Sequence, residues 1–187
     1  MRATDIGLPT DALAYAERRG ILRQVIRGVY LGATHVEHPL LDLAAWTLRH
    51  PSAVGGLLTA AVYHDLTNAF ADGTWLFIPQ GKSPPRSRIE PLHVVQTSGR
   101  WILPQFDDLN GISRLQVHGV EVRLTSRERT TLDLWRYPRH ISAEHAIDAL
   151  RRCVREPGFR LPEFARLAKR LDAWDHVERV LQGLMLR

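Results

Sequence analysis

The segment LQVHGVEVRLTSRERTTLDL, residues 115–134, is the most informative stretch of the chain. Apolar and polar side chains alternate over residues 115–124, as in a strand with one buried face, and Gly119 is expected to bend or bulge it. Thr125 and Glu128 then have the spacing of a capping box, in which Thr125 caps the helix start and Glu128 reaches back. The segment therefore predicts a strand that leads into a helix ending near Arg136.

The same kinds of pattern extend over the rest of the chain, in both directions from this segment. Turn residues separate apolar stretches with helical or strand-like spacing. Strands are predicted near residues 21–25, 29–31, 74–78 and 92–96, and helices near residues 10–19, 39–49, 58–66, 142–154, 161–171 and 173–185. The order predicts an α+β protein with a mostly antiparallel sheet, accompanying helices and a helical C-terminus.

Composition excludes several classes of protein. The single cysteine, Cys153, rules out an internal disulfide and a four-cysteine metal site, and it fits a reducing cytosol. The longest run without charge or histidine, residues 51–63, is too short to span a bilayer. Residues 1–5 lack the apolar stretch of a secretory signal. We therefore expect a cytoplasmic protein that does not enter a membrane.

The charged residues are dominated by arginine. The chain has 25 basic and 20 acidic residues, a net charge of +5, and its only lysines are Lys82 and Lys169. Arginine presents a planar fork that matches phosphates and guanine edges, although a GC-rich genome would also favour it. Residues 151–187 carry nine cations against five anions, a net of +4. A basic surface favours polyanionic partners but does not by itself establish one.

The N-terminal segment has the layout of a winged helix-turn-helix. A short helix near residues 10–19 precedes Gly20, and two short β-rich runs then flank a turn at Arg27-Gly28. In the helix, Leu13 and Ala16 share one face, whereas Tyr15 and Arg18 lie on another. Because only residues 1–6 precede the turn at Gly7, the winged helix is expected to be partial, with at most the end of its second helix.

Four segments together resemble one bacterial family. They are residues 27–30 (RGVY), 59–68 (TAAVYHDLTN), 75–79 (WLFIP, followed by Gly81 and Lys82) and 118–134. Their order and spacing resemble those of the AbiEi-type antitoxins, which are transcriptional regulators of type IV toxin–antitoxin operons. The resemblance covers nearly the whole chain.

This resemblance implies two activities, neither of which needs catalysis or a cofactor. Residues 1–33 would form a partial winged helix that binds double-stranded operator DNA and represses its own operon. Residues 34–187 would form an α+β antitoxin domain, ending in a helical segment, that counteracts a nucleotidyltransferase-like toxin from the same operon. A homodimer is expected, since repressors of this type usually read two half-sites.

The candidate DNA contacts lie on the predicted helix and wing. Tyr15 and Arg18 would face the major groove, and Arg23 and Arg27 would straddle phosphates from the wing. The alternative is that these are ordinary solvated residues of an incomplete module. The complete predicted set is Thr10, Tyr15, Arg18, Arg19, Arg23 and Arg27.

A second candidate surface is a set of C-terminal cations. It would bind an acidic partner or nucleic acid, although a solvated helical face is the usual meaning of such a run. Its members are Arg151, Arg152, Arg155, Arg166, Lys169 and Arg170. Arg129 and Asp133, four residues apart, would form an ion pair at a structural helix start or a contact with the toxin.

Metal-dependent and catalytic functions find little support. His35 and His38 have a spacing that metals use, but neither a cysteine nor a second histidine pair lies near them in sequence. Asp107-Asp108 followed by Glu121-x-Arg123 hints at a metal nuclease, with arginine where lysine is expected. We therefore expect no metal site and no catalytic residue. The DNA-binding antitoxin is the first hypothesis, a toxin-neutralising interaction module without DNA binding the second, and a nuclease the third.

Overall fold

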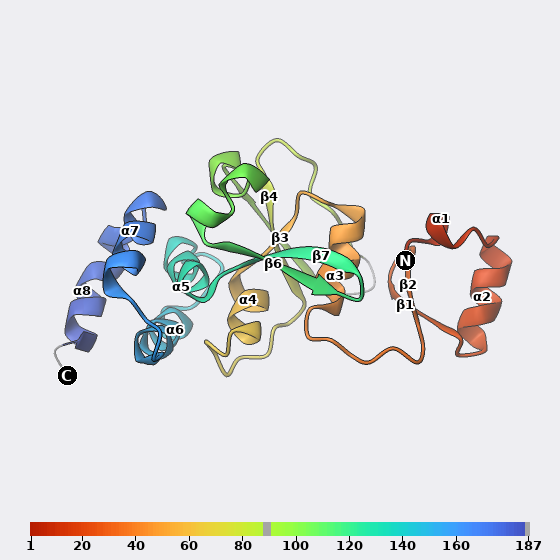
Figure 1. The fold of residues 1–187 in the computed structure, drawn as a ribbon, viewed down its shortest axis with the longest axis horizontal. Helices are drawn as coiled ribbons and strands as arrows, with labels where there is room; N and C mark the ends of the chain where they lie inside the picture. The colour runs from red at the N-terminus through yellow and green to blue at the C-terminus, as the bar shows by residue number, and fades with distance from the viewer. Residues whose placement is uncertain (88–90, 186–187) are drawn as a thin grey trace.

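A computed structural model describes residues 1–87 and 91–185. The molecule is elongated, with a small N-terminal lobe at one end, a central sheet, and a group of helices at the other end (Figure 1). The class is α+β, as predicted. No helix among the described residues is both long enough and apolar enough to cross a membrane.

The N-terminal lobe consists of two helices and a hairpin. Helix α1 (Ala3–Ile6) ends at Gly7, whose left-handed backbone (φ 69°) turns the chain into α2 (Thr10–Arg18). Strands β1 (Leu22–Ile26) and β2 (Val29–Gly32) then form an antiparallel hairpin. Short helix, turn, longer helix and hairpin is the order expected of a partial winged helix-turn-helix.

The central sheet has five strands in the order β5-β4-β3-β7-β6. Neighbours β5 and β4 are parallel, as are β3 and β7, whereas β4–β3 and β7–β6 are antiparallel. The five-stranded sheet is therefore mixed, with two antiparallel and two parallel pairs, and not mostly antiparallel, whereas the separate N-terminal hairpin is antiparallel. The strands are β3 (Val54–Gly55), β4 (Thr74–Pro79), β5 (Leu92–Thr97), β6 (Ile112–Val117) and β7 (Val120–Thr125).

Helices cover both faces of this sheet. Helix α3 lies towards the lobe, and α5 to α8 gather on the opposite side (Figure 1). Three short 3-10 helices, η1 (Gly99–Trp101), η2 (Pro104–Phe106) and η3 (Asp108–Asn110), join β5 to β6. The remaining helices are α3 (Leu41–Arg49), α4 (Leu57–Tyr63), α5 (Arg127–Arg136), α6 (Ala143–Arg155), α7 (Leu161–Arg170) and α8 (Trp174–Met185).

Two apolar cores form because side chains alternate along β4. Trp75 and Phe77 pack with α4 to α8, whereas Leu76 and Ile78 pack with α3 and the N-terminal hairpin. The buried hairpin residues, Val25, Ile26, Val29 and Leu31, therefore belong to the same core as α3. Because the hairpin and α3 share this core, the core does not separate residues 1–33 from residues 34–187. The predicted domain boundary between residues 33 and 34 therefore stays a prediction.

The segment 115–134 differs from its prediction in two details. His118 and Gly119 both have positive φ (48° and 77°) and form a two-residue hairpin turn, so the expected bent strand is in fact the two strands β6 and β7. The helix cap is Ser126, whose Oγ accepts a hydrogen bond from the Arg129 backbone N–H at 3.2 Å. Thr125 cannot cap, because it still pairs with Ile112 in the sheet.

Other boundaries agree with prediction to within one to three residues. Helix α4 ends at Tyr63 and not at Leu66, since Asp65 adopts a left-handed backbone (φ 56°) that cannot continue a helix. Helix α3 begins at Leu41 and not at Pro39.

His64, just after α4, is expected to make stability depend on pH. Its Nε2–H donates to the Thr125 carbonyl at 2.7 Å, and burial lowers the pKa of the imidazole below its usual 6.5. Below about pH 6.5 the His64 imidazole is therefore protonated more readily in the unfolded chain than in the folded protein. As a result, the free energy of unfolding falls as pH falls. His64→Gln should reduce this loss in urea unfolding measured at about pH 7.5 and 5.5. The exposed His176→Gln is the control, and an unchanged pH dependence in His64→Gln would contradict the prediction.

Candidate nucleic-acid interface

Helix α2 presents one polar face to solvent because its other face is buried. Leu13 and Ala16, three residues apart, are buried, and the helix packs on β1. The predicted contacts Thr10, Tyr15, Arg18 and Arg19 are all exposed. The structure thus places three of the six predicted DNA contacts on α2 and a fourth, Arg19, directly after its last residue.

Two of these side chains form a pair on the helix surface. Arg19 Nε donates to the Tyr15 hydroxyl at 3.0 Å, and the guanidinium carbon lies 5.4 Å from the ring centroid. Tyr15 remains 51% exposed, so its ring is available to a partner. Asp11 and Glu17 are also exposed on α2 and reduce the positive charge of the helix.

The hairpin turn carries the fifth predicted contact. Gly28 has φ 78°, a left-handed conformation that glycine adopts without strain, and Arg27 beside it is exposed. Arg23, the sixth, differs from the others, because its Nη1 lies 2.6 Å from Glu37 Oε1. Among the described residues, no carboxylate lies within ion-pair distance of Arg18, Arg19 or Arg27.

The predicted C-terminal cations do not form one free surface. Arg151 pairs with Asp148 at 3.2 Å, and Arg152 donates to Asp65 and Asn68 beyond the end of α4. Lys169 Nζ lies 5.6 Å from the Trp174 ring centroid, and Arg170 Nε donates to Asn110 Oδ1 at 2.9 Å. Arg155 and Arg166 are exposed on different helices, α6 and α7.

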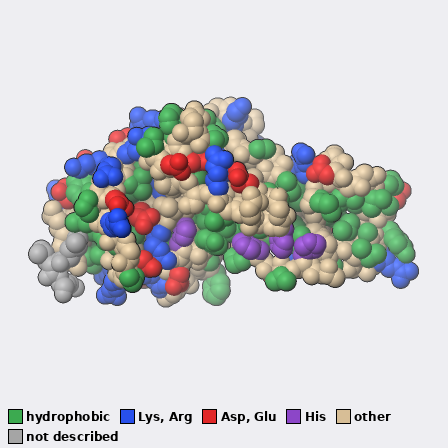
Figure 2. Space-filling model, in the orientation of Figure 1, with side chains coloured by type: hydrophobic (Ala, Val, Ile, Leu, Met, Phe, Trp, Pro, Cys, Tyr) green, Lys and Arg blue, Asp and Glu red, His purple; other side chains and the backbone are tan. Residues whose placement is uncertain are grey.

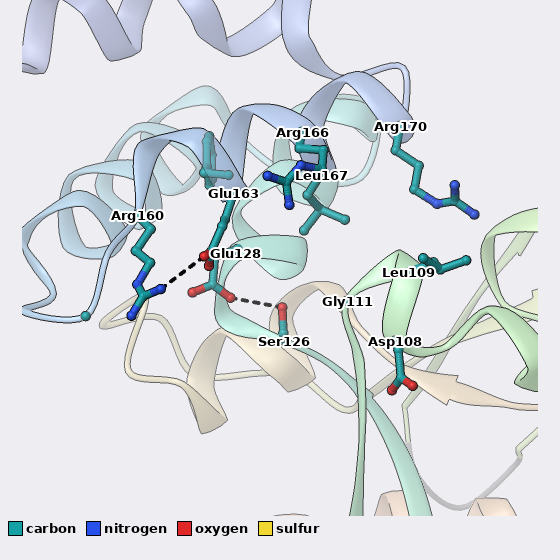
Figure 3. Close-up of a pocket in the computed structure, with 12 residues that line it drawn as sticks. Asp108, Leu109, Gly111, Ser126, Glu128, Arg160, Glu163, Arg166, Leu167 and Arg170 are labelled. Carbon is teal, nitrogen blue, oxygen red and sulfur yellow. Dashed lines mark hydrogen bonds and ion pairs between the residues drawn. The ribbon is translucent and has the colours of Figure 1, made fainter.

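Arg166 and Arg170 belong instead to a cleft of about 520 Å³ beside α7. Figure 3 shows them on α7, opposite Ser126 and Glu128 at the start of α5 and Leu109 on η3. Charges of both signs line the cleft, since it contains three arginines and three carboxylates: Arg160, Arg166, Arg170, Asp108, Glu128 and Glu163. Arg160 and Glu163 pair at 3.2 Å.

Histidines gather at the junction of the lobe and the body (Figure 2). His118, from the β6–β7 turn, lies with its ring centroid 5.4 Å from that of His35 and 6.3 Å from that of His38, a neighbour that the sequence did not indicate. His38 Nδ1 accepts a hydrogen bond from the Leu40 N–H at 3.0 Å. Across residues 1–87 and 91–185, no group of three or more potential ligands is arranged to hold a metal ion.

Two of the three carboxylates that hinted at a nuclease, Asp107 and Glu121, are engaged by arginines, whereas Asp108 is exposed and lines the cleft beside α7. Buried Asp107 accepts hydrogen bonds from Arg123 Nε at 3.0 Å and from Arg114 Nε at 3.1 Å, and Arg114 also pairs with Glu121 at 3.1 Å. Arg129 and Asp133 do pair, at 2.7 Å, but both are fully buried. These residues serve the packing of η1–η3 against β6, β7 and α5.

The structure defines an α+β protein whose N-terminal lobe of two helices and a hairpin exposes arginine side chains. No family model matches the chain, and no curated protein matches it. One similar solved structure is the crystal structure of the RV2827C protein from Mycobacterium tuberculosis, with a TM-score of 0.61 and 17% sequence identity. The match covers 95% of this chain but 66% of that one, so the chain spans slightly less than two thirds of its neighbour's length. At this identity the likeness shows the fold alone.

Proposed function

We propose that this chain is a DNA-binding transcriptional regulator, and, following its resemblance to the AbiEi-type antitoxins, the antitoxin of a type IV toxin–antitoxin operon. The observation that carries the DNA-binding proposal is the exposed face of α2. Tyr15 and Arg18 point away from the buried Leu13 and Ala16, and Arg18 is not neutralised by a described carboxylate. An arginine on the exposed face of a helix is suited to contact guanine edges when that helix lies in the major groove.

Binding to duplex DNA at increasing salt tests this proposal. The probes are a duplex with the sequence upstream of the protein's own gene and a duplex of the same composition in scrambled order. Wild type should prefer the first, and Arg18→Gln should lose about 1–3 kcal/mol of this preference. Arg160→Gln, the same substitution at the far end of the molecule, should leave it unchanged. Failure of wild type to bind either duplex at low salt would refute the DNA-binding proposal.

A second candidate function is neutralisation of a toxin by direct contact, without DNA. The cleft beside α7 favours it, because Leu109 is 57% exposed at its edge while Arg166 and Arg170 line it. An apolar anchor among charges of both signs is a common arrangement at protein–protein interfaces.

Co-expression with the neighbouring open reading frame tests the antitoxin proposal. The chain should relieve growth inhibition by the neighbouring product, and Leu109→Asp should abolish the relief if the cleft makes the contact. Val36→Asp, at an 80% exposed position outside the cleft, should preserve it. Toxicity that is unaffected by the wild-type chain would remove the antitoxin assignment.

A further inference from the structure

A second basic feature of the lobe lies where the hairpin turn meets α3. A shallow pocket of about 300 Å³ is lined by Arg2, Ala3, Thr4, Arg27, Gly28 and Arg49. All three arginines are exposed, and none of the lining residues is acidic. The cleft beside α7 differs in charge, because three carboxylates line it together with three arginines.

Backbone contacts bring these three arginines together from distant parts of the chain. Arg2 pairs with Val29 in an antiparallel bridge, and the Ala3 N–H donates to the Gly28 carbonyl at 2.9 Å. Arg49, at the C-terminal end of α3, donates through Nη1 to the Arg27 carbonyl at 2.9 Å. The arginines are therefore held at the pocket by the N-terminal segment, the hairpin turn and α3.

Most of the guanidinium donors at the pocket have no acceptor among the described residues. Arg2 uses its Nε for Asp5, at 3.1 Å, and no described residue accepts from its two terminal nitrogens. Arg49 uses only Nη1, and no described residue accepts from the Arg27 side chain. Asp5 offsets part of the charge of Arg2 but does not line the pocket.

Three cations around one hollow repel one another unless an anion lies between them. A phosphate group suits this arrangement, because its oxygens accept several charge-assisted hydrogen bonds and arginine matches its geometry. The pocket adjoins Arg27 of the hairpin turn, where a wing would meet the DNA backbone.

We infer that the pocket formed by Arg2, Arg27 and Arg49 binds a backbone phosphate of duplex DNA. The inference rests on the proposed DNA-binding function and extends it beyond the lobe, since Arg49 belongs to α3 of the body. Phosphate contacts carry no sequence information, so this pocket contributes affinity and orientation, and α2 contributes the choice of sequence.

The test measures binding of the full chain to the scrambled duplex at roughly 50 to 200 mM salt, for Arg2→Gln, Arg49→Gln and the control Arg160→Gln. Complete loss of one phosphate contact lowers the slope of log affinity against log salt by about 0.9. The double variant Arg2→Gln/Arg49→Gln should therefore show a fall in affinity over this range that is about three- to fourfold smaller. Each single variant should show part of this change, because the other arginines still face the phosphate. Arg2→Gln is essential, because it keeps the Arg49–Arg27 hydrogen bond that holds the hairpin turn. Thermal unfolding verifies that each variant is folded.

The possible outcomes separate this inference from the function on which it rests. Flattened slopes in both pocket variants, with Arg160→Gln unchanged, support the phosphate site. Unchanged slopes in both variants, while Arg18→Gln still weakens operator preference, overturn the site and leave the DNA-binding proposal standing. Absence of wild-type binding at low salt refutes both. A pocket that takes up inorganic phosphate in a titration, without any effect of Arg2 or Arg49 on DNA binding, would be a free-anion site and would also overturn the inference.

Discussion

Asp133→Ala is expected to lower the free energy of unfolding by about 3–5 kcal/mol, because it leaves a buried charge without its partner. Asp133 accepts hydrogen bonds from Arg129 Nε and from Arg136 Nη1, both at 2.7 Å. Without it, the fully buried Arg129 would keep only the carbonyls of Asn110 and Trp101 as acceptors. For a chain of this size we expect a fall in Tm of about 6–20 °C, measured by calorimetry.

Two further variants make this prediction specific. Asp148→Ala breaks an exposed pair with Arg151 and should cost about 0.5 kcal/mol or less. Arg129→Met added to Asp133→Ala should recover part of the loss, since it removes the unpaired charge. A loss below about 1 kcal/mol in Asp133→Ala would show that Arg129 finds other partners or water.

Gly56→Ala is expected to lower the free energy of unfolding by about 1–3 kcal/mol or more, because the added methyl group overpacks the core. An added Cβ would lie 2.2 Å from Phe77 Cε2 and 2.5 Å from Cδ2. Phe77 is fully buried, in the same core as residues of α4. The Gly56 backbone is extended, so the cost comes from this contact and not from backbone strain. Urea unfolding provides the measurement.

Gly158→Ala is the matched control for this prediction. Nothing lies within 4 Å of a Cβ at Gly158, so its unfolding free energy should change by about 0.5 kcal/mol or less. Phe77→Leu combined with Gly56→Ala should cost less than the sum of the two single variants, because the smaller side chain relieves the clash. Strict additivity would contradict the proposed contact.

Local sequence patterns predict much of the fold. The parts that they fail to predict are very short elements or rest on contacts between residues that are distant in the sequence. The longer helices have a clear apolar face and were predicted to within a few residues. Strand β3 has only two residues, too few for any periodicity to indicate it. The sequence does not indicate the turn at His118-Gly119, because a two-residue hairpin turn is usually marked by asparagine or aspartate before glycine, and histidine stands there.

The candidate site divides in the same way. Tyr15 and Arg18 follow from helical spacing alone, since Leu13 and Ala16 fix which face is buried. Arg2 and Arg49 could not be predicted, because residues 2, 27 and 49 meet only after the hairpin packs on α3. Likewise, the spacing of Arg129 and Asp133 predicted their ion pair but not its complete burial, which depends on η1 and η3.

The common core of the hairpin and α3 limits how the lobe can move. Val29 and Leu31 of the hairpin belong to the same buried core as Leu43 and Ala44 of α3, and β1 contacts α3 directly, so the hairpin is packed on the body. If two such chains sit side by side on an operator, the distance between their α2 helices is therefore dictated by how the bodies pair. Inserting half a helical turn of DNA between the two half-sites would turn one half-site to the opposite face of the duplex. Because the hairpin packs on the body, we expect such a dimer to lose contact with that half-site.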